Sequence, residues 1–211
     1  MLKTFQTCPV KFWYKYVKML NVPQKSSVFE KGKKVHALAN YYLRGDNIEK
    51  LEKTLTEEEH ELWGRLKNNE YFQKKYINSE YNLSAKIDKY WVGGRLDALV
   101  EDENNIYILD YKTGSVPKDA QNDYQTQIYL VCVSEFYKNT DKKISFVYID
   151  LKNNRNYTID FDNDKKERYI ASLIKICKNI EENKCIVHNS VNKTCEYCEY
   201  KKFCFNGEDY E

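Results

Sequence analysis

The chain has 211 residues, 42% of them hydrophobic and 31% charged, which indicates a folded globular protein and excludes a disordered one. A formal net charge of +2 excludes a strongly basic protein but allows a local basic surface. The sequence lacks a run of about 18 apolar residues and a signal-peptide core, so we expect no membrane span. We therefore expect a cytoplasmic protein whose seven cysteines stay reduced.

The first 45 or so residues predict two helices. One starts near Pro9, because proline is favoured in the first helical turn. Cys8 stands directly before it, where the helix dipole favours a thiolate, although a small buried apolar role is the alternative. The second helix covers 28–43, and His36 lies beside its apolar stripe. A lone histidine there is more often a hydrogen-bonded core residue than a metal ligand.

The next segment carries no recognisable chemistry. Residues 46–78 are polar and helical in character, and Thr56 to Glu59 has the pattern of a capping box. A strand is predicted over 80–87. Glu80 is interpreted as an exposed residue at the start of that strand, with a supporting position near a site as the alternative.

Two further strands form the centre of the predicted fold. The runs 93–101 and 106–112 flank a polar turn, so they predict an antiparallel hairpin. Asp110 and Lys112 are two residues apart and leave the same face, and Asp97 on the partner strand can lie beside them. Two converging carboxylates suit a divalent metal such as magnesium, and a lysine can stabilise charge on a phosphate. The hairpin therefore outlines a phosphodiester hydrolysis site.

The residues after the hairpin strengthen this interpretation. A lone Asp-x-Lys is far more often a surface salt bridge, so neighbouring motifs decide its meaning. Here a helix that begins near Lys118 carries Gln125 and Tyr129 four residues apart, on one face that can cover the site. Later elements are predicted as a strand over 142–150, a return strand over 157–159 and a helix over about 165–182.

Three cysteines near the C-terminus have the spacing C-x2-C-x5-C, which is a metal-ligand pattern. They are Cys195, Cys198 and Cys204. Zinc and iron–sulfur clusters both accept such thiolates and usually need a fourth ligand. Cys8 is the natural supplier, and it would tie the N-terminal helix to the C-terminus. Cys132 and Cys177 are assigned to the core, and Cys185 is left open.

Taken together, these motifs resemble the RecB/AddB-type nuclease domains of the PD-(D/E)XK superfamily. The chain is most similar to the compact four-cysteine members related to CRISPR-adaptation exonucleases. The residues that carry the resemblance are Thr4-Phe5-x-x-Cys8-Pro9-x-x-Phe12, Gly32-x-x-Val35-His36, Gly94-Arg95-Leu96-Asp97-Ala98, Leu109-Asp110-Tyr111-Lys112-Thr113-Gly114, Gln125-x-x-x-Tyr129 and Cys195-x2-Cys198-x5-Cys204. They follow the family's order over nearly the whole chain, although residues 46–78 match nothing specific.

The resemblance implies an α/β fold with a restriction-endonuclease-like core. It predicts a central mixed sheet flanked by helices, and an iron–sulfur clamp that joins the N- and C-termini. We expect a single nuclease domain over 1–211. Its parts would be an N-terminal helical part at 1–79, a catalytic sheet core at 80–160, and a C-terminal helix with the cysteine cluster at 161–211.

The resemblance also assigns roles to residues. The metal ligands it implies, for Mg²⁺ or Mn²⁺, are His36, Asp97, Asp110 and the carbonyl of Tyr111. Lys112 would be the catalytic lysine, and Gln125 and Tyr129 would complete the catalytic set near the DNA. The four cysteines would carry a [4Fe–4S] cluster, with Zn²⁺ as the alternative. Candidate contacts to the nucleic-acid backbone are Lys33, Lys34, Arg95 and Lys118.

The expected function is metal-dependent cleavage of DNA, as a single-strand exonuclease in DNA repair, recombination or CRISPR-type processing. The partner protein that we expect is a helicase or an integrase. The alternative is a catalytically silent DNA-binding or assembly module, although such a module does not need the set of Asp97, Asp110 and Lys112. A zinc-stabilised adaptor would explain the cysteines but not the acidic site.

Overall fold

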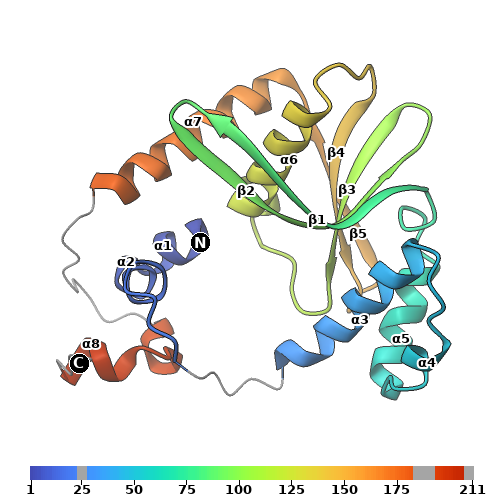
Figure 1. Ribbon diagram of the computed structural model, residues 1–211, viewed down its shortest axis with the longest axis horizontal. Coiled ribbons are helices and arrows are strands. Elements are labelled where there is room, and N and C mark those ends of the chain that lie inside the picture. The colour runs from blue at the N-terminus through green and yellow to red at the C-terminus, as the bar shows by residue number, and fades with distance from the viewer. Residues whose placement is uncertain (23–27, 183–192, 207–211) are drawn as a thin grey trace. The chain divides into compact units, whose positions relative to one another are not determined.

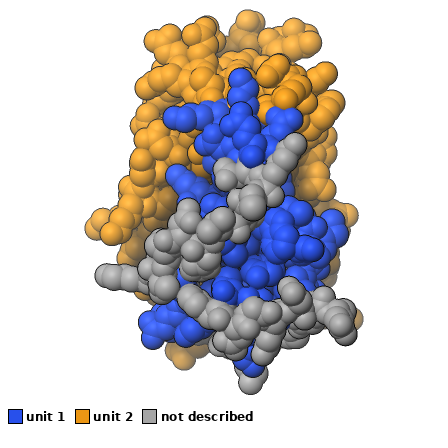
Figure 2. Space-filling view, turned by 90° about the vertical axis from the view of Figure 1, so that its left-hand side faces the viewer, with its two compact units in different colours: residues 1–26, 175–211 blue, residues 27–174 orange. Residues whose placement is uncertain are grey.

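The computed structural model describes residues 1–22, 28–182 and 193–206. Its contacts divide the chain into two compact units, which Figure 2 colours separately. Unit 1 comprises residues 1–26 and 175–211, and unit 2 comprises residues 27–174. The single-domain organisation with its three predicted parts stays a prediction.

Unit 2 is built on one five-stranded sheet with the strand order β1-β2-β3-β4-β5 (Figure 1). The strands are β1 (Lys75–Ile87), β2 (Tyr90–Glu101), β3 (Asn105–Lys112), β4 (Lys143–Asp150) and β5 (Arg155–Phe161). Neighbouring strands pair antiparallel except β3 and β4, which pair parallel and need a crossover connection. This mixed sheet with flanking helices confirms the predicted α/β fold class.

The helices of unit 2 lie before, between and after these strands in the sequence. They are α3 (Val28–Leu43), α4 (Glu49–Glu52), α5 (Glu57–Lys67), α6 (Tyr124–Phe136) and the first part of α7 (Asn163–Glu182), with a 3₁₀ turn at Ala120–Asn122. The predicted capping box of α5 is confirmed, because Thr56 and Glu59 each accept a hydrogen bond from the other's backbone N–H. The crossover from β3 to β4 runs through α6.

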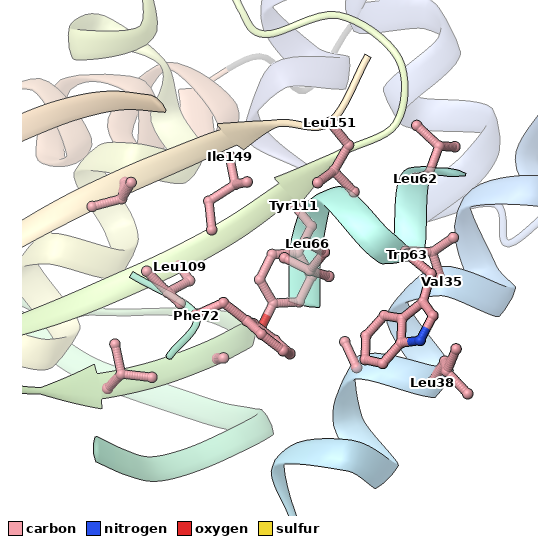
Figure 3. Packing of buried hydrophobic residues seen from close by; sticks show 14 of the residues in the cluster. Val35, Leu38, Leu62, Trp63, Leu66, Phe72, Leu109, Tyr111, Ile149 and Leu151 are labelled. Atoms are coloured by element: carbon pink, nitrogen blue, oxygen red, sulfur yellow. The ribbon is translucent and has the colours of Figure 1, made fainter. Parts of the chain in front are cut away.

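A large buried cluster positions α3 next to the strand ends (Figure 3). Val35 of α3, Leu66 of α5 and Leu109 of β3 are all fully buried in it. Burying side chains of this size stabilises the fold by roughly 1.5–3 kcal/mol each. Because His36 directly follows Val35, the packing of α3 also fixes where this histidine emerges.

Several element boundaries differ from the predictions, and two of the differences lie in elements that carry residues of the site. β1 begins at Lys75, before the predicted strand start at residue 80, because its polar first residues pair with the end of β2. The predicted helical part over 1–79 therefore ends in a strand. Helix α6 begins at Tyr124 rather than near Lys118, and Asp123 caps it by accepting a hydrogen bond from the Gln125 N–H.

Unit 1 brings together segments from both ends of the sequence. Its elements are α1 (Leu2–Thr7), α2 (Pro9–Phe12), a π-helical turn (Trp13–Val17), a 3₁₀ helix (Lys193–Tyr197), α8 (Lys201–Asn206) and the end of α7. Lys11 forms an ion pair with Glu199 at 2.7 Å, and the Tyr14 and Tyr200 rings stack at 5.6 Å. Among all the described helices, none combines the length and apolar character that crossing a membrane requires.

Candidate active site

The β2–β3 hairpin places two acidic residues side by side. Ala98 pairs with Leu109, so Asp97 and Asp110 lie directly beyond that pair. The Tyr111 N–H donates a hydrogen bond to Asp97 Oδ2 at 2.9 Å, which orients this carboxylate. Asp110 is only 2% exposed.

Helix α3 adds His36 to this group. His36 Nδ1 lies 3.2 Å from Asp97 Oδ1, and Nε2 lies 3.0 Å from the Tyr111 carbonyl oxygen. Burial alone would lower the pKa of His36, but the hydrogen bond that its ring donates to Asp97 and the charges of Asp97 and Asp110 raise it above its ordinary value. The ring can donate from both nitrogens only when it is protonated. His36 therefore faces the acidic residues, which is the less common of the two alternatives for a lone histidine.

Glu80 also belongs to this group, and the interpretation of it as an exposed strand-start residue is wrong. It lies inside β1, its side chain is 20% exposed, and its φ of 49° is rare for a residue with a side chain. Ligand atoms of His36, Glu80 and Asp97 all lie within 4.8 Å of one another. The signal that could have found Glu80 is register. Once Ser79 pairs with Ala98, the next position of β1 falls beside Asp97.

Helix α6 covers the group with the predicted pair of residues. Gln125 Nε2 donates to Asp110 Oδ1 at 2.5 Å, and its Oε1 lies 3.4 Å from Lys112 Nζ. The Tyr129 hydroxyl donates to the Arg95 carbonyl at 2.5 Å. The close approach of the Tyr129 ring to β2 requires a glycine at position 94, because a Cβ there would lie 2.5 Å from the ring.

The electrostatics of Asp110 suit a cation. Burial and then the charge of Asp97 raise the pKa of Asp110, Lys112 opposes both effects, and the net result is a pKa of about 7. Lys112 Nζ lies 2.6 Å from Asp110 Oδ2, yet within the described residues this buried oxygen accepts no well-aligned hydrogen bond. Carboxylates with one imidazole and a carbonyl form a donor set that divalent cations accept. The residues present therefore fit a divalent metal.

An open cleft of about 620 Å³ adjoins this group, and His36, Glu80 and Arg95 are among its lining residues. Of the four basic residues predicted to contact DNA, Lys33 and Arg95 line the cleft. Arg95 also forms an ion pair with Glu80. Lys34 instead lies 3.3 Å from a buried glutamate of α5, and Lys118 is exposed in the loop after β3.

The predicted cysteine ligands lie in unit 1. Three of them line one pocket of about 280 Å³, namely Cys8, Cys195 and Cys198. Burial and then the charges of these three neighbours raise the pKa of Cys204 to about 11, which indicates that it lies near them. None of the six described cysteines forms a disulfide. In unit 2 Cys132 is buried as predicted, whereas Cys185 lies outside the described residues.

Comparison with known proteins defines the class of this site. The family described as the PD-(D/E)XK nuclease superfamily matches residues 1–205, so the chain belongs to this superfamily. The match confirms the superfamily predicted from the motifs.

The chain is also similar to individual proteins, among them the following two. The CRISPR-associated exonuclease Cas4 of Francisella tularensis subsp. novicida (strain U112) is 27% identical over 124 residues, which are 59% of this chain and 61% of the relative. The match therefore spans less than two thirds of that relative's length. A crystal structure named "Putative exonuclease", from Eubacterium rectale, aligns with a TM-score of 0.50 and 14% identity over 85% of this chain and 80% of that one. At this identity it shows a shared fold alone.

Proposed function

We propose that the chain is a divalent-metal-dependent deoxyribonuclease that acts as an exonuclease on single strands. The observation that carries this proposal is the pairing of buried Asp110 with Lys112, next to the group of His36, Glu80 and Asp97. The desolvation of Asp110 raises its pKa toward neutral. Burying a carboxylate in this way costs free energy, and a purely structural strand end does not require it. Membership of a nuclease superfamily supports the same activity.

The residues that would hold Mg²⁺ or Mn²⁺ are Asp97, Asp110, His36 and the Tyr111 carbonyl, with Glu80 as a further carboxylate. Such a cation polarises the phosphate and lowers the pKa of a bound water. His36 has to lose one ring proton before that nitrogen can act as a ligand, because both nitrogens now face oxygen atoms. Protons therefore compete with the metal at this residue.

Lys112 would stabilise the negative charge that develops on the phosphate oxygens. Its ammonium group is held by Asp110 at 2.6 Å and by Gln125 at 3.4 Å, and it lies 5.4 Å from the centre of the Tyr148 ring. These contacts fix the donor before substrate arrives, so little reorganisation is needed during the reaction. Gln125 positions both members of the pair, because it also donates to Asp110.

The proposed substrate is DNA with a single-stranded end. Lys33 and Arg95 line the cleft and provide positive charge for phosphate contacts. A relative named as a CRISPR-associated exonuclease supports a place in CRISPR-type DNA processing, with repair or recombination as further settings. We also propose a cytoplasmic location and a helicase or an integrase as partner.

We further propose that Cys8, Cys195, Cys198 and Cys204 carry a [4Fe–4S] cluster that stabilises unit 1, with Zn²⁺ as the alternative. Four thiolates around zinc, each bound at about 2.3 Å, would lie roughly 3.8 Å apart. In the described part of the chain, the group of three ligand atoms within 4.8 Å is His36, Glu80 and Asp97 rather than cysteines. By number alone the four thiolates fit either group, and the resemblance to four-cysteine nucleases favours the iron–sulfur cluster.

The proposed activity can be tested with end-labelled single-stranded DNA. Wild-type protein should shorten the strand in Mg²⁺ or Mn²⁺, and a chelator should stop it. Asp110→Asn should abolish cleavage, whereas Asp164→Asn, which changes an exposed carboxylate of α7, should leave it intact. Tight DNA binding without cleavage in any divalent metal would instead support the silent assembly module.

A further inference from the structure

The β1–β2 hairpin extends beyond the part of the sheet that holds the acidic group (Figure 1). β2 pairs with β3 only over Ala98–Glu101, whereas its pairing with β1 continues to Tyr90. Residues 81–96 therefore form a two-stranded ribbon, which we call the β1–β2 ribbon. One face of it packs on α6, where Tyr129 contacts Gly94 and the Cys132 thiol donates to the Val92 carbonyl.

The opposite face of the ribbon is exposed and is built from three cross-strand pairs. The pairs are Asn82 with Arg95, Ser84 with Gly93, and Lys86 with Trp91. Arg95 lines the cleft, so this face begins at the proposed active site. Trp91 lies four residues from Arg95 along β2, which corresponds to roughly 13 Å of extended strand.

Trp91 is unusual among the large apolar residues of this unit because it is 71% exposed. The ribbon does not need its ring for packing, since the neighbouring Val92 and Leu96 are buried against the interior. Gly93 keeps the path between Arg95 and Trp91 free of a side chain. A Cβ at Gly93 would lie 2.5 Å from the Leu83 carbonyl oxygen, so a larger residue is not accommodated without a shift of backbone.

We propose that the exposed face of the β1–β2 ribbon binds the single-stranded part of the nucleic acid that leads to the cleft. Trp91 stacks on an unpaired base, and Lys86 and Arg95 contact phosphates. A ring flanked by cations, on a polar face continuous with the cleft, is what sequence-independent single-strand binding requires. The inference rests on the proposed nuclease function and deepens it, because it names the path of the substrate.

Binding is tested first without catalysis. The anisotropy of a labelled oligothymidylate is measured in chelator, so that no strand is cleaved. Trp91→Ala should weaken affinity about tenfold, because stacking on an aromatic ring contributes that order of magnitude per base. Trp91→Phe should keep most of the affinity. Phe136→Ala is the matched control, since this ring is 59% exposed and contacts Tyr81 rather than the proposed face.

The salt dependence of binding tests the phosphate contact independently. Lys86→Ala should reduce the slope of log affinity against log salt by about 0.7, the value for one phosphate of a single strand. The proposal would be overturned if Lys86→Ala kept the wild-type salt slope and Trp91→Ala kept the wild-type affinity. A changed oligomeric state of Trp91→Ala with unchanged DNA affinity would assign the ring to a protein interface and would also overturn it.

Cleavage then separates this inference from the proposed function. The ratio of kcat/KM for a long oligothymidylate to that for a dinucleotide should fall about tenfold in Trp91→Ala, because the dinucleotide is too short to reach the ring. An unchanged ratio would overturn the ribbon path while leaving the nuclease intact. If wild-type protein cleaves neither substrate, the proposed catalysis fails, yet the binding experiment still decides the ribbon.

Discussion

The acidic group of unit 2 and the cysteine group of unit 1 are held together in different ways. Asp97, Asp110 and Lys112 come from one hairpin, so short-range pairing positions them, and α3 and α6 add the remaining side chains. The cysteine group needs both ends of the chain, which contacts such as Lys11 with Glu199 hold together. Unit 2 should therefore stay folded when a single residue of the acidic group changes, whereas the folding of unit 1 should depend on its proposed cofactor.

The largest expected effect follows from this dependence. Cys8→Ser should release the [4Fe–4S] cluster, bleach the protein and unfold or aggregate unit 1, because one of four ligands is lost. Iron and sulfide analysis and the Tm of anaerobically purified protein measure it. Cys132→Ser is the matched control, since this thiol is buried in unit 2 and should leave the colour unchanged. A colourless wild-type protein with one bound zinc would refute the cluster.

Glu80 offers a smaller and purely functional effect. If its carboxylate supports the metal, Glu80→Gln should raise the Mg²⁺ concentration for half-maximal cleavage roughly 10- to 100-fold. The amide keeps the size of the side chain, so the Tm should change little. Glu70→Gln, at an exposed position of unit 2, should show wild-type metal dependence. Equal metal dependence in both variants would leave Glu80 as a partner of Arg95 alone.

The pH dependence of stability sharpens the picture of Asp110. Burial raises its pKa from 3.8 to about 7, so the folded state binds the proton more tightly than the unfolded state does. The stability that this proton contributes is complete below pH 3.8 and is lost as the pH rises through about 7. Metal-free wild-type protein should therefore lose Tm relative to Asp110→Asn across this range.

Added Mg²⁺ should restore the Tm of the wild type at pH 8 but not that of Asp110→Asn, because a bound cation favours the carboxylate. His36 acts in the same direction, since its pKa is also raised and its stabilising contribution is lost at higher pH. Parallel Tm curves for wild type and Asp110→Asn would contradict the assigned burial of this charge.

The smallest expected effect lies outside both groups. Thr56→Ala removes the side-chain acceptor of the α5 capping box and should lower the free energy of unfolding by about 1 kcal/mol. Urea unfolding measures this change. The residues of the acidic group come from α3, α6 and the strands rather than from α5, so the kcat of cleavage should stay the same. A lower kcat would show that α5 helps to place His36.

The sequence predicts the acidic hairpin well because its information is local. The spacing of Asp110 and Lys112 sets one face, and a short polar turn sets the pairing with the strand of Asp97. The role of Glu80 could not be predicted in this way, since its left-handed φ breaks the strand pattern and its neighbours are known only once β1 is in register. The ion pair of Lys34 could not be predicted either, because its partner lies on another helix. Such contacts between distant elements leave no periodic pattern in the sequence.

The central claim is that the Asp110 and Lys112 pair performs the hydrolysis, and a single-turnover measurement on Lys112→Ala tests it most directly. Excess protein is mixed with end-labelled single-stranded DNA in Mn²⁺, and the cleavage rate and bound fraction are followed in the same samples. We expect a rate at least about a hundredfold below wild type with DNA binding largely retained, because the variant loses only the lysine charge that stabilises the transition state. A wild-type rate in this variant would contradict it.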